Sequence, residues 1–239
     1  SKLIKKNIIA ELIKFNPYSN NDNVIKYYDG KIINEKDIIY VDLKNLSKEE
    51  IFKNYKKSCK KKLKKILLNK EIKIKIENTR DSLKNFKKLY DESMKRLNAK
   101  ESYFKNDNFY SKIHKNMKNN FFVFSLIDEN EIQTSQLLLF DKNNLYCHMY
   151  GSTDKAKKKS LILLSYHRLI NWAKDKKFNY IDFGGGRTSE MNDSLLNFKK
   201  NFSITSKNLY IGEMILNDFI YEKLIKNSQN NNAKLFKYR

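Results

Sequence analysis

Cysteine and histidine are scarce in this sequence of 239 residues, which holds two of the first and three of the second. Cys59 and Cys147 lie far apart, each in an apolar-periodic segment, so they form neither a disulfide framework nor a metal site. We expect reduced, half-buried thiols. None of the three histidines has ligand spacing to a cysteine or a carboxylate, so we expect no metal.

Long hydrophobic runs are also absent. No apolar segment approaches the roughly 20 residues that span a bilayer, and no signal-peptide pattern opens the chain. We therefore expect a cytoplasmic protein, and a first residue Ser1 in place of methionine allows for processing or trimming. Hydrophobic residues make up 40% of the chain, which is enough for a packed core rather than a disordered tail.

Acidic residues are outnumbered, with 27 Asp and Glu against 49 Lys and Arg, and the formal net charge is +22. A basic surface indicates an anionic partner, such as nucleic acid, a phosphorylated small molecule or an acidic membrane. The alternative is compositional, because lysine, asparagine and isoleucine are over-used together. We give the second explanation more weight for the bulk of the lysines, so only those at special positions count.

Apolar periodicity predicts an alternation of helices and strands. Three closely spaced strands after residue 120 predict an antiparallel meander, and a strand that follows the helix 161–176 indicates a parallel crossover. Segment 8–15 fits either a helix or a buried strand. The predicted helices are 47–67 (with a Ser47–Glu50 capping box), 81–97, 106–117, 161–176 and 218–225, and the predicted strands are 24–28, 38–43, 71–77, 121–127, 132–140, 145–150, 180–183 and 209–215.

Three consecutive glycines, Gly184, Gly185 and Gly186, end the strand 180–183, and they are half of all the glycines in the chain. A bare backbone there allows another molecule to approach closely. Phe198, Lys199 and Phe202 follow on a predicted short helix. A strand-end turn is the plainer explanation of the glycines alone, but the aromatic and basic helix beside them favours a ligand-facing loop.

Two lysine-rich segments are candidates for anion contact. The run Lys155–Lys159 forms a predicted basic loop before the helix 161–176, where free amides and the helix dipole favour a phosphate. In the helix 47–67 a lysine-rich face lies opposite the apolar stripe. This face is either solvated or relieved of its self-repulsion by an anion along the helix, and the sequence does not choose between the two.

The order of these elements resembles the GNAT acyltransferase fold, and the motifs resemble the FemAB family of non-ribosomal peptidyltransferases. The resemblance implies an α+β fold with a central mixed, largely antiparallel sheet flanked by helices. Family members carry two tandem GNAT-like domains, whereas residues 1–46 match only the end of the first. The motifs are 11–17, 58–65, 90–96, His148-Met149-Tyr150-Gly151-Ser152, 171–174, Asp182-Phe183-Gly184-Gly185-Gly186 and 198–203.

The resemblance implies a division into 1–46 as the remnant or edge of a first GNAT-like domain, 47–226 as a GNAT-like acyltransferase domain, and 227–239 as a polar tail. The long charged helical hairpin of some members is missing between Leu67 and Arg80. The chain is therefore similar to the branch without that arm, or to GNAT-like enzymes that acylate other amines.

The resemblance also implies a substrate site. Phe198 and Lys199 match positions that meet the terminal nucleotides of the donor tRNA, and Tyr150 matches a tyrosine near a bound nucleotide-sugar. Lys199 is the catalytic candidate, through electrostatic stabilisation, whereas Asp182 is either a base or a structural cap. Phe198 and Tyr150 each have a plain alternative as packing residues. The remaining expected substrate contacts are Gly184, Gly185, Gly186 and Arg187 in the loop, and Arg96 with Tyr103 as a clamp on the acceptor diphosphate.

The leading functional hypothesis is transfer of an aminoacyl group from tRNA to a primary amine of a peptidoglycan precursor, such as UDP-MurNAc-pentapeptide or lipid II. It implies the tRNA acceptor end as a partner, peripheral contact with the inner membrane surface and no tightly bound cofactor. One alternative is acylation of an amino sugar by acyl-CoA, with Lys155–Lys159 on the pyrophosphate. The other is a non-catalytic, basic nucleic-acid-binding module.

Overall fold

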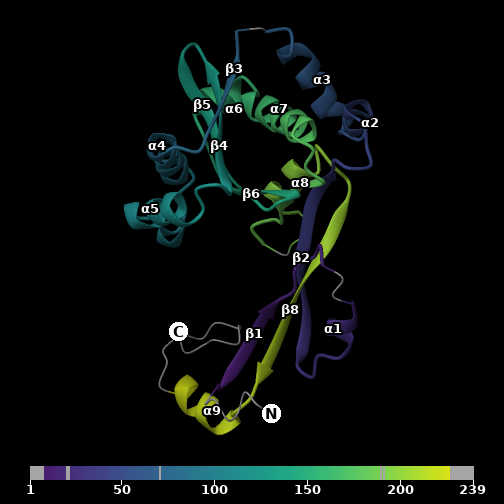
Figure 1. Cartoon of the computed structure of the whole chain (residues 1–239), viewed down its shortest axis with the longest axis vertical. Coiled ribbons are helices and arrows are strands. Elements are labelled where there is room, and N and C mark those ends of the chain that lie inside the picture. The colour runs from purple at the N-terminus through teal and green to yellow at the C-terminus, as the bar shows by residue number, and fades with distance from the viewer. Residues whose placement is uncertain (1–7, 20–21, 70, 189, 191, 227–239) are drawn as a thin grey trace. The chain divides into compact units, whose positions relative to one another are not determined.

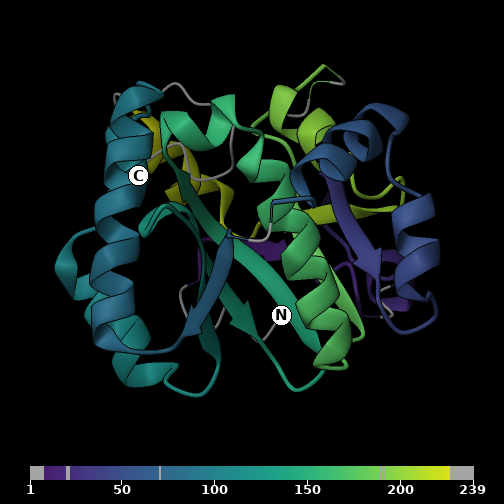
Figure 2. The ribbon, with the colours of Figure 1, turned by 90° about the horizontal axis from the view of Figure 1, so that it is seen from above.

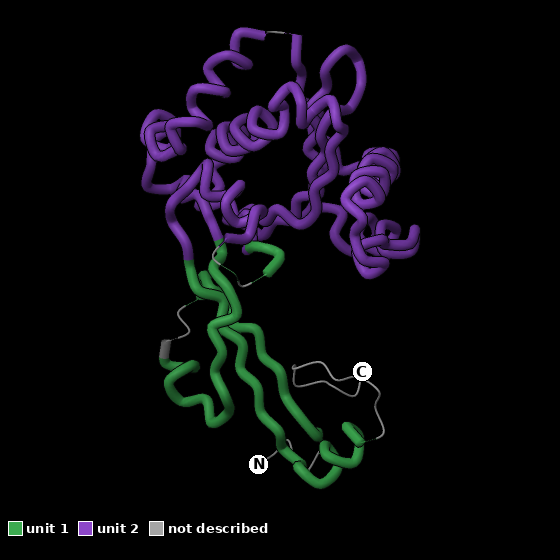
Figure 3. The backbone as a smooth tube through the Cα atoms, turned by 180° about the vertical axis from the view of Figure 1, so that it is seen from behind, with its two compact units in different colours: residues 1–38, 186–191, 207–239 green, residues 39–185, 192–206 purple. Residues whose placement is uncertain are grey.

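The computed structural model describes residues 8–19, 22–69, 71–188, 190 and 192–226. The chain divides into two compact units, each of which packs mainly against itself (Figure 3). The first unit contains residues 1–38, 186–191 and 207–239, and the second contains residues 39–185 and 192–206.

Strands β1 and β8 pair in the first unit, running antiparallel with Lys14 opposite Ile211. The segment 8–15, for which a helix and a strand were both open, is therefore a strand. Tyr28 packs tightly here, because a Cβ atom at Gly212 would lie 2.7 Å from its ring. The elements of this unit are β1 (Ala10–Lys14), α1 (Asp22–Lys26), the first part of β2 (Lys31–Asp42), most of β8 (Ser206–Ile215) and α9 (Asp218–Lys226).

The strand predicted at 24–28 is wrong, because residues 22–26 form helix α1. The amide of Tyr27 donates to the carbonyl of Asn23 at 3.2 Å, which is a helical bond. Val24 and Tyr27 are exposed, so the apolar residues here mark no buried face. A short apolar cluster without alternation does not distinguish strand from helix.

A mixed, largely antiparallel sheet forms the centre of the second unit, in the order β2-β7-β6-β5-β4-β3 (Figure 1). Among these strands only β6 and β7 are parallel, while β2–β7, β3–β4, β4–β5 and β5–β6 are antiparallel. The predicted meander and the parallel crossover are both confirmed. Besides the end of β2, the strands are β3 (Lys73–Glu77), β4 (Phe121–Asp128), β5 (Glu131–Phe140), β6 (Asn144–Ser152) and β7 (Tyr180–Gly184).

Helices cover both faces of this sheet, with α4 and α5 on one face and α7 on the other (Figure 2). Strand alternation explains the division: Val123 packs into the cluster of α4 and α5, whereas its neighbour Phe124 packs into the larger core with α7. The helices of the unit are α2 (Lys48–Lys53), α3 (Lys57–Ile66), α4 (Arg80–Arg96), the 3₁₀ turn η2 (Glu101–Tyr103), α5 (Asp107–Asn116), α6 (Asp154–Lys158), α7 (Leu161–Asp175) and α8 (Ser194–Lys199).

The predicted helix 47–67 is two helices, α2 and α3. Its capping box is present, with the Ser47 amide donating to the Glu50 carboxylate at 2.7 Å and the Glu50 amide donating to the Ser47 hydroxyl at 3.2 Å. The helix breaks because the Lys56 amide donates to the carbonyl of Asn201 at 3.0 Å instead of continuing the helical ladder. This bond ties the start of α3 to the chain that follows α8.

Helix α4 approaches the backbone of β6 closely at Gly151. A Cβ atom at Gly151 would lie 2.9 Å from Cα and 3.0 Å from N of Tyr90. At the C-terminal end of the same helix, Arg96 donates to the carbonyl of Ser152 and its Nε lies 3.0 Å from Asp154. The helix is thus held against β6 at two points by its backbone and one side chain.

The two cysteines are free, Cys59 buried and Cys147 half-buried. None of the helices in the described ranges combines the length and the apolar character needed to cross a bilayer. The interpretation of 1–46 as part of a first GNAT-like domain stays a prediction, and the expected polar tail 227–239 lies outside the described residues.

Candidate functional site

The parallel strands β6 and β7 diverge in the middle of the sheet. Their ladder covers three residue pairs, from Asn144–Tyr180 to Tyr146–Asp182. Beyond that point β6 follows β5 to Ser152, while β7 follows β2 as far as the pair Ile39–Gly184. Divergence of neighbouring strands leaves room for side chains and ligands between their carboxyl ends, as in open α/β sheets.

Lys199 lies at the end of β7. It ends helix α8, and the carboxylate of the N-cap residue Asp193 accepts the Leu196 amide at 2.8 Å. Only 7% of Lys199 is exposed, and its Nζ donates to the carbonyl of Gly185 at 2.6 Å. Lysine is rarely buried to this degree without a partner, and here the packing of α8 places the charge at the divergence of the strands, where the Gly185 carbonyl accepts from it.

The glycine loop shapes this place through its backbone. Gly184 has φ +71°, the left-handed region that favours glycine. A Cβ atom there would lie 3.5 Å from Nζ of Lys199. Its amide donates to a carboxylate oxygen of Asp182 at 2.5 Å, the capping contact that was one of the two expectations for Asp182.

The thiol of Cys147 faces the same charges. Burial raises its pKa well above the ordinary value, the Asp182 carboxylate adds to this effect, and the Lys199 ammonium opposes it. The thiol therefore stays protonated near neutral pH. It also lies 3.8 Å from the amide oxygen of Gln136, to which it donates weakly.

Tyr166 of α7 lies at the centre of a cluster of aromatic residues beside the site. Its ring centroid lies 5.6 Å from that of Tyr150, 5.2 Å from that of Phe198 and 5.2 Å from that of Phe202, on which it stacks. Tyr150 and Phe198 thus share one cluster although they are distant in sequence. Phe202 follows α8 rather than lying on it.

The hydroxyl oxygen of Tyr150 is buried and has no hydrogen-bond partner of good geometry among the described residues. Burial raises its pKa well above the ordinary value, while Thr134 and Ser152 act in the opposite direction. The group is therefore a neutral hydroxyl at neutral pH. Thr134 and Ser152 are near this buried hydroxyl but bond it with poor geometry, so a ligand could improve its hydrogen bonding.

A cavity of about 320 Å³ opens beside Phe198, between α3, the start of α7 and α8. Ser160, the N-cap residue of helix α7, has φ +58° and gives the helix no side-chain cap. Lys62 and Lys157 bring positive charge to the same place, so a helix N-terminus and two cations converge on one cavity. Its lining residues are Ser58, Cys59, Lys62, Lys157, Ser160, Ile162, Leu163, Phe198 and Asn201.

The prediction of a basic loop before helix α7 is wrong, because residues 154–158 form helix α6. The helix is capped by Thr153, whose hydroxyl accepts the Ala156 amide at 3.0 Å. Lys155 and Lys159 of this run are bonded to Glu129 at 2.6 Å and 2.8 Å. Lys157 is the member of the run that lines the cavity.

The remaining predicted site residues lie elsewhere. Arg96 is bonded to Ser152 and Asp154, as described above, and Tyr103 is 45% exposed in η2. Gly186 and Arg187 belong to the first unit. Within the second unit, the structure brings together Tyr150, Gly184, Gly185, Phe198 and Lys199.

Sequence reasoning missed Tyr166 and Cys147 as residues of this site, and it named Lys62 and Lys157 only as members of lysine-rich segments. Tyr166 lies on the apolar face of a strongly periodic helix, where periodicity alone assigns it to the core. The two lysines are part of lysine-rich runs, so only packing distinguishes them from their neighbours. Cys147 could have been identified from its position in the sequence, because it directly precedes the motif that begins at His148 and contains Tyr150.

Comparison with known proteins places residues 53–200 in a family described as acetyltransferase (GNAT) domain. No curated protein sequence matches the chain. Among solved structures, FemX is 14% identical with a TM-score of 0.71, covering 93% of this chain and 76% of that chain. L-PGS from Bacillus licheniformis is 15% identical with a TM-score of 0.62, covering 88% and 69%. A C-terminal domain from Agrobacterium fabrum, titled as a candidate lysylphosphatidylglycerol synthetase, is 12% identical with a TM-score of 0.57, covering 77% and 61%.

The family match covers more than half of the chain, and the structural likenesses at these identities show the fold. The expected α+β fold, with its mixed and largely antiparallel sheet flanked by helices, is confirmed, as is the resemblance to FemAB-like proteins at the level of the fold. The chain belongs to the acetyltransferase (GNAT) domain family and is an acyltransferase of the GNAT fold.

Proposed function

We propose that this acyltransferase moves an aminoacyl group from tRNA to a primary amine of a cell-envelope precursor. The observation that carries the proposal is the buried Lys199, whose Nζ is bonded to Gly185 where β6 and β7 diverge. This is a fixed positive charge beside a backbone without side chains. Such a charge is suited to the oxyanion of acyl transfer.

In the proposed reaction the nitrogen of the acceptor amine attacks the carbonyl carbon of the aminoacyl ester. A C–N bond forms and the carbonyl oxygen becomes an oxyanion that the ammonium of Lys199 stabilises. The ester C–O bond then breaks, and the ribose hydroxyl that leaves takes up the proton that the amine loses. Because an ammonium group has three N–H donors, its bond to Gly185 is compatible with donation to the oxyanion.

The donor would enter through the 320 Å³ cavity. Lys62, Lys157 and the start of α7 supply positive potential for phosphate groups, and Phe198 offers a ring face for a base. The same features suit the pyrophosphate of acyl-CoA, and the match to an acetyltransferase domain family favours this second donor. Acylation of an amino sugar by acyl-CoA is therefore the alternative activity.

The acceptor class rests on the relatives. The resemblance to the FemAB family supports a peptidoglycan precursor, such as UDP-MurNAc-pentapeptide or lipid II, and the lysylphosphatidylglycerol synthetase likeness supports an acceptor at the membrane surface. We place Tyr150 on the acceptor side, with its buried hydroxyl. Arg96 could clamp a diphosphate only by exchanging its contact with Asp154 for one with phosphate. Tyr103, Gly186 and Arg187 stay proposed contacts.

The test of this function is intact-mass analysis of UDP-MurNAc-pentapeptide incubated with the protein and a mixed pool of charged tRNA. A parallel reaction contains acetyl-CoA and an amino sugar. A gain of one amino-acid residue supports the proposal and names the residue, whereas an acetyl gain moves the chain to the CoA-dependent alternative. Salt-sensitive RNA binding with no mass gain on either acceptor, or on a lipid-linked precursor, would support a binding module instead.

Lys199→Met removes the charge and keeps most of the side-chain volume. We expect kcat to fall by about 10²–10³-fold with a small change in KM, which is the effect of losing one oxyanion donor. The matched control is Lys200→Met, one residue further along at the end of α8. Equal loss in both variants, or full activity of Lys199→Met, would remove Lys199 from the mechanism.

A further inference from the structure

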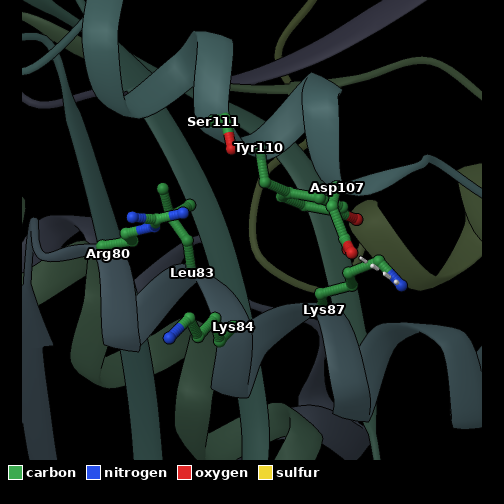
Figure 4. A pocket seen from close by; sticks show the side chains of 7 residues that line it. All are labelled: Arg80, Leu83, Lys84, Lys87, Asp107, Tyr110 and Ser111. Atoms are coloured by element: carbon green, nitrogen blue, oxygen red, sulfur yellow. Dashed lines mark ion pairs between the residues drawn. The ribbon is translucent and has the colours of Figure 1, made fainter.

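We propose a second ligand site, which takes a small phosphate ester, in the groove between helices α4 and α5 (Figure 4). The groove encloses a cavity of about 250 Å³. It shares no lining residue with the cavity beside Phe198, so this inference is independent of the proposed acyl transfer. The lining residues are Arg80, Leu83, Lys84, Lys87, Asp107, Tyr110 and Ser111.

Three cations line one wall of this groove. Arg80, Lys84 and Lys87 follow one another at helical spacing on α4, which places them along the same face of the helix. Their sum exceeds the single carboxylate of the lining, that of Asp107. Lys84 and Lys87 also have carboxylate partners, so the positive charge on offer to an anionic ligand is centred on Arg80.

These cations differ in how they are engaged. Lys87 lies 2.8 Å from Asp91 and 3.7 Å from Asp107, so the structure already uses its charge. Lys84 lies 3.3 Å from Asp81, but both side chains are exposed and such pairs are weak. Arg80 lines the groove, and among the described residues its guanidinium takes part in no ion pair or hydrogen bond. Its planar fork is available for a phosphate, the anion that guanidinium groups bind well.

Tyr110 of α5 gives the second, independent observation. Only 5% of this residue is exposed, it lines the cavity, and its hydroxyl has no hydrogen-bond partner in the described structure. Burial first, and the Asp91 carboxylate next, raise its pKa far above the ordinary value, so the hydroxyl keeps its proton. Buried hydroxyls are seldom left unpaired, and a polar group of a ligand in the groove would satisfy this one.

Figure 4 shows how the charged side chains are arranged along the groove. Arg80 lies toward one end of the groove, and the ion pair of Lys87 with Asp107 lies toward the other. Arg80 and Lys87 are seven residues apart, which is about 10 Å along a helix. A ligand whose phosphate lies at Arg80 and Lys84 must therefore extend by a few bonds to bring a hydroxyl group to Tyr110.

The volume limits the ligand to a small molecule. A space of about 250 Å³ is smaller than a typical pocket for a drug-sized ligand, which holds roughly 300–1,000 Å³. It accepts a phosphate with a short hydroxylated chain. The side chain of Leu83 offers the carbon atoms of such a chain an apolar contact.

The experiment titrates the full chain with glycerol 3-phosphate and, separately, with inorganic phosphate, by calorimetry at low salt. We expect glycerol 3-phosphate to bind more tightly than inorganic phosphate. Arg80→Ala should weaken both ligands by about tenfold, because a charge-assisted hydrogen bond is lost. Tyr110→Phe should weaken glycerol 3-phosphate alone, by a few fold. The control is Lys112→Ala, which removes an exposed cation of α5 outside the groove.

Thermal unfolding of Tyr110→Phe without ligand provides a second readout. If the hydroxyl is unpaired, the variant melts at the same or a higher temperature than the natural chain, because a buried unsatisfied group is removed. A lower melting temperature shows that the hydroxyl already has a structural partner and overturns the proposal. Equal binding by Arg80→Ala and Lys112→Ala, or no binding of glycerol 3-phosphate to the natural chain, overturns it as well.

Discussion

Replacing Gly151 by alanine tests the packing that holds helix α4 on strand β6. The added Cβ atom would lie 2.9 Å from Cα and 3.0 Å from N of Tyr90. Ordinary contacts of such atoms begin near 3.5 Å. Because both opposing atoms belong to the backbone, no rotamer change relieves the overlap, and the whole helix must move by about half an ångström.

Such overpacking costs about 1–3 kcal/mol. Without the overlap, the same change would have the opposite sign, because alanine restricts the unfolded chain and stabilises by about 0.4–1 kcal/mol where the backbone allows it. Gly151 does not have the positive φ that would disfavour alanine. Whether Gly151→Ala lowers or raises stability therefore shows directly whether residue 151 is in close contact with the Tyr90 backbone.

Urea denaturation of the natural chain and of Gly151→Ala measures this difference. We expect a lower midpoint with an unchanged slope, because the surface exposed on unfolding stays the same. In a cycle with Tyr90→Ala the two losses should add, since removing the Tyr90 side chain leaves its backbone in place. Stabilisation by Gly151→Ala, or its rescue by Tyr90→Ala, would refute the reasoning.

Two further predictions concern the core and the loop. His167 is buried, and burial first and Arg168 next lower its pKa to about 4, so the unfolded chain binds the proton more tightly than the folded one. The contribution of His167 to the free energy of unfolding should be complete above about pH 6.5 and should shrink by roughly 3 kcal/mol toward pH 4. Denaturation measured across this range should show a smaller pH dependence of stability in His167→Gln. An identical pH profile in the two proteins would contradict the lowered pKa of His167. Gly184→Ala forces a left-handed backbone on alanine at a cost of about 1 kcal/mol and places a methyl group 3.5 Å from Nζ of Lys199. Acyl transfer should fall by a larger factor than the stability loss implies, and an active variant with normal kcat would argue against a close approach of the substrate here.

Much of the fold could be predicted from local patterns. The alternation in 121–150 and the strong periodicity of 161–176 predict the meander and the crossover helix, because each burial pattern repeats with the period of its element. The triple glycine and Lys199 were expected to lie together, and Lys199 does contact Gly185 at the end of β7, whereas their role in binding a ligand stays a prediction. Helix α6 was also within reach, because Thr153 is a favoured N-cap residue.

Other features depend on contacts between distant segments, which no local pattern records. The apolar stripe of 51–63 continues unbroken through the gap between α2 and α3, and only the bond from Lys56 to Asn201 shows why the helix stops there. The choice of Lys62 and Lys157 among many lysines is likewise made by packing. Arg96 was predicted to bind a diphosphate, but in the structure its guanidinium bonds Ser152 and Asp154.

The pairing of β7 with β2 has a consequence for how the site is assembled. Residues 39 and 184 are neighbours in this ladder, so closing it requires a loop of about 145 residues, whereas the β4–β5 hairpin closes across a turn at Asp128 and Glu131. Loop-closure entropy makes contacts between distant residues slow to form. On a growing chain the hairpin can fold while α8 has yet to be synthesised. We therefore expect the charge of Lys199 to be buried late in folding, after the β4–β5 hairpin has formed.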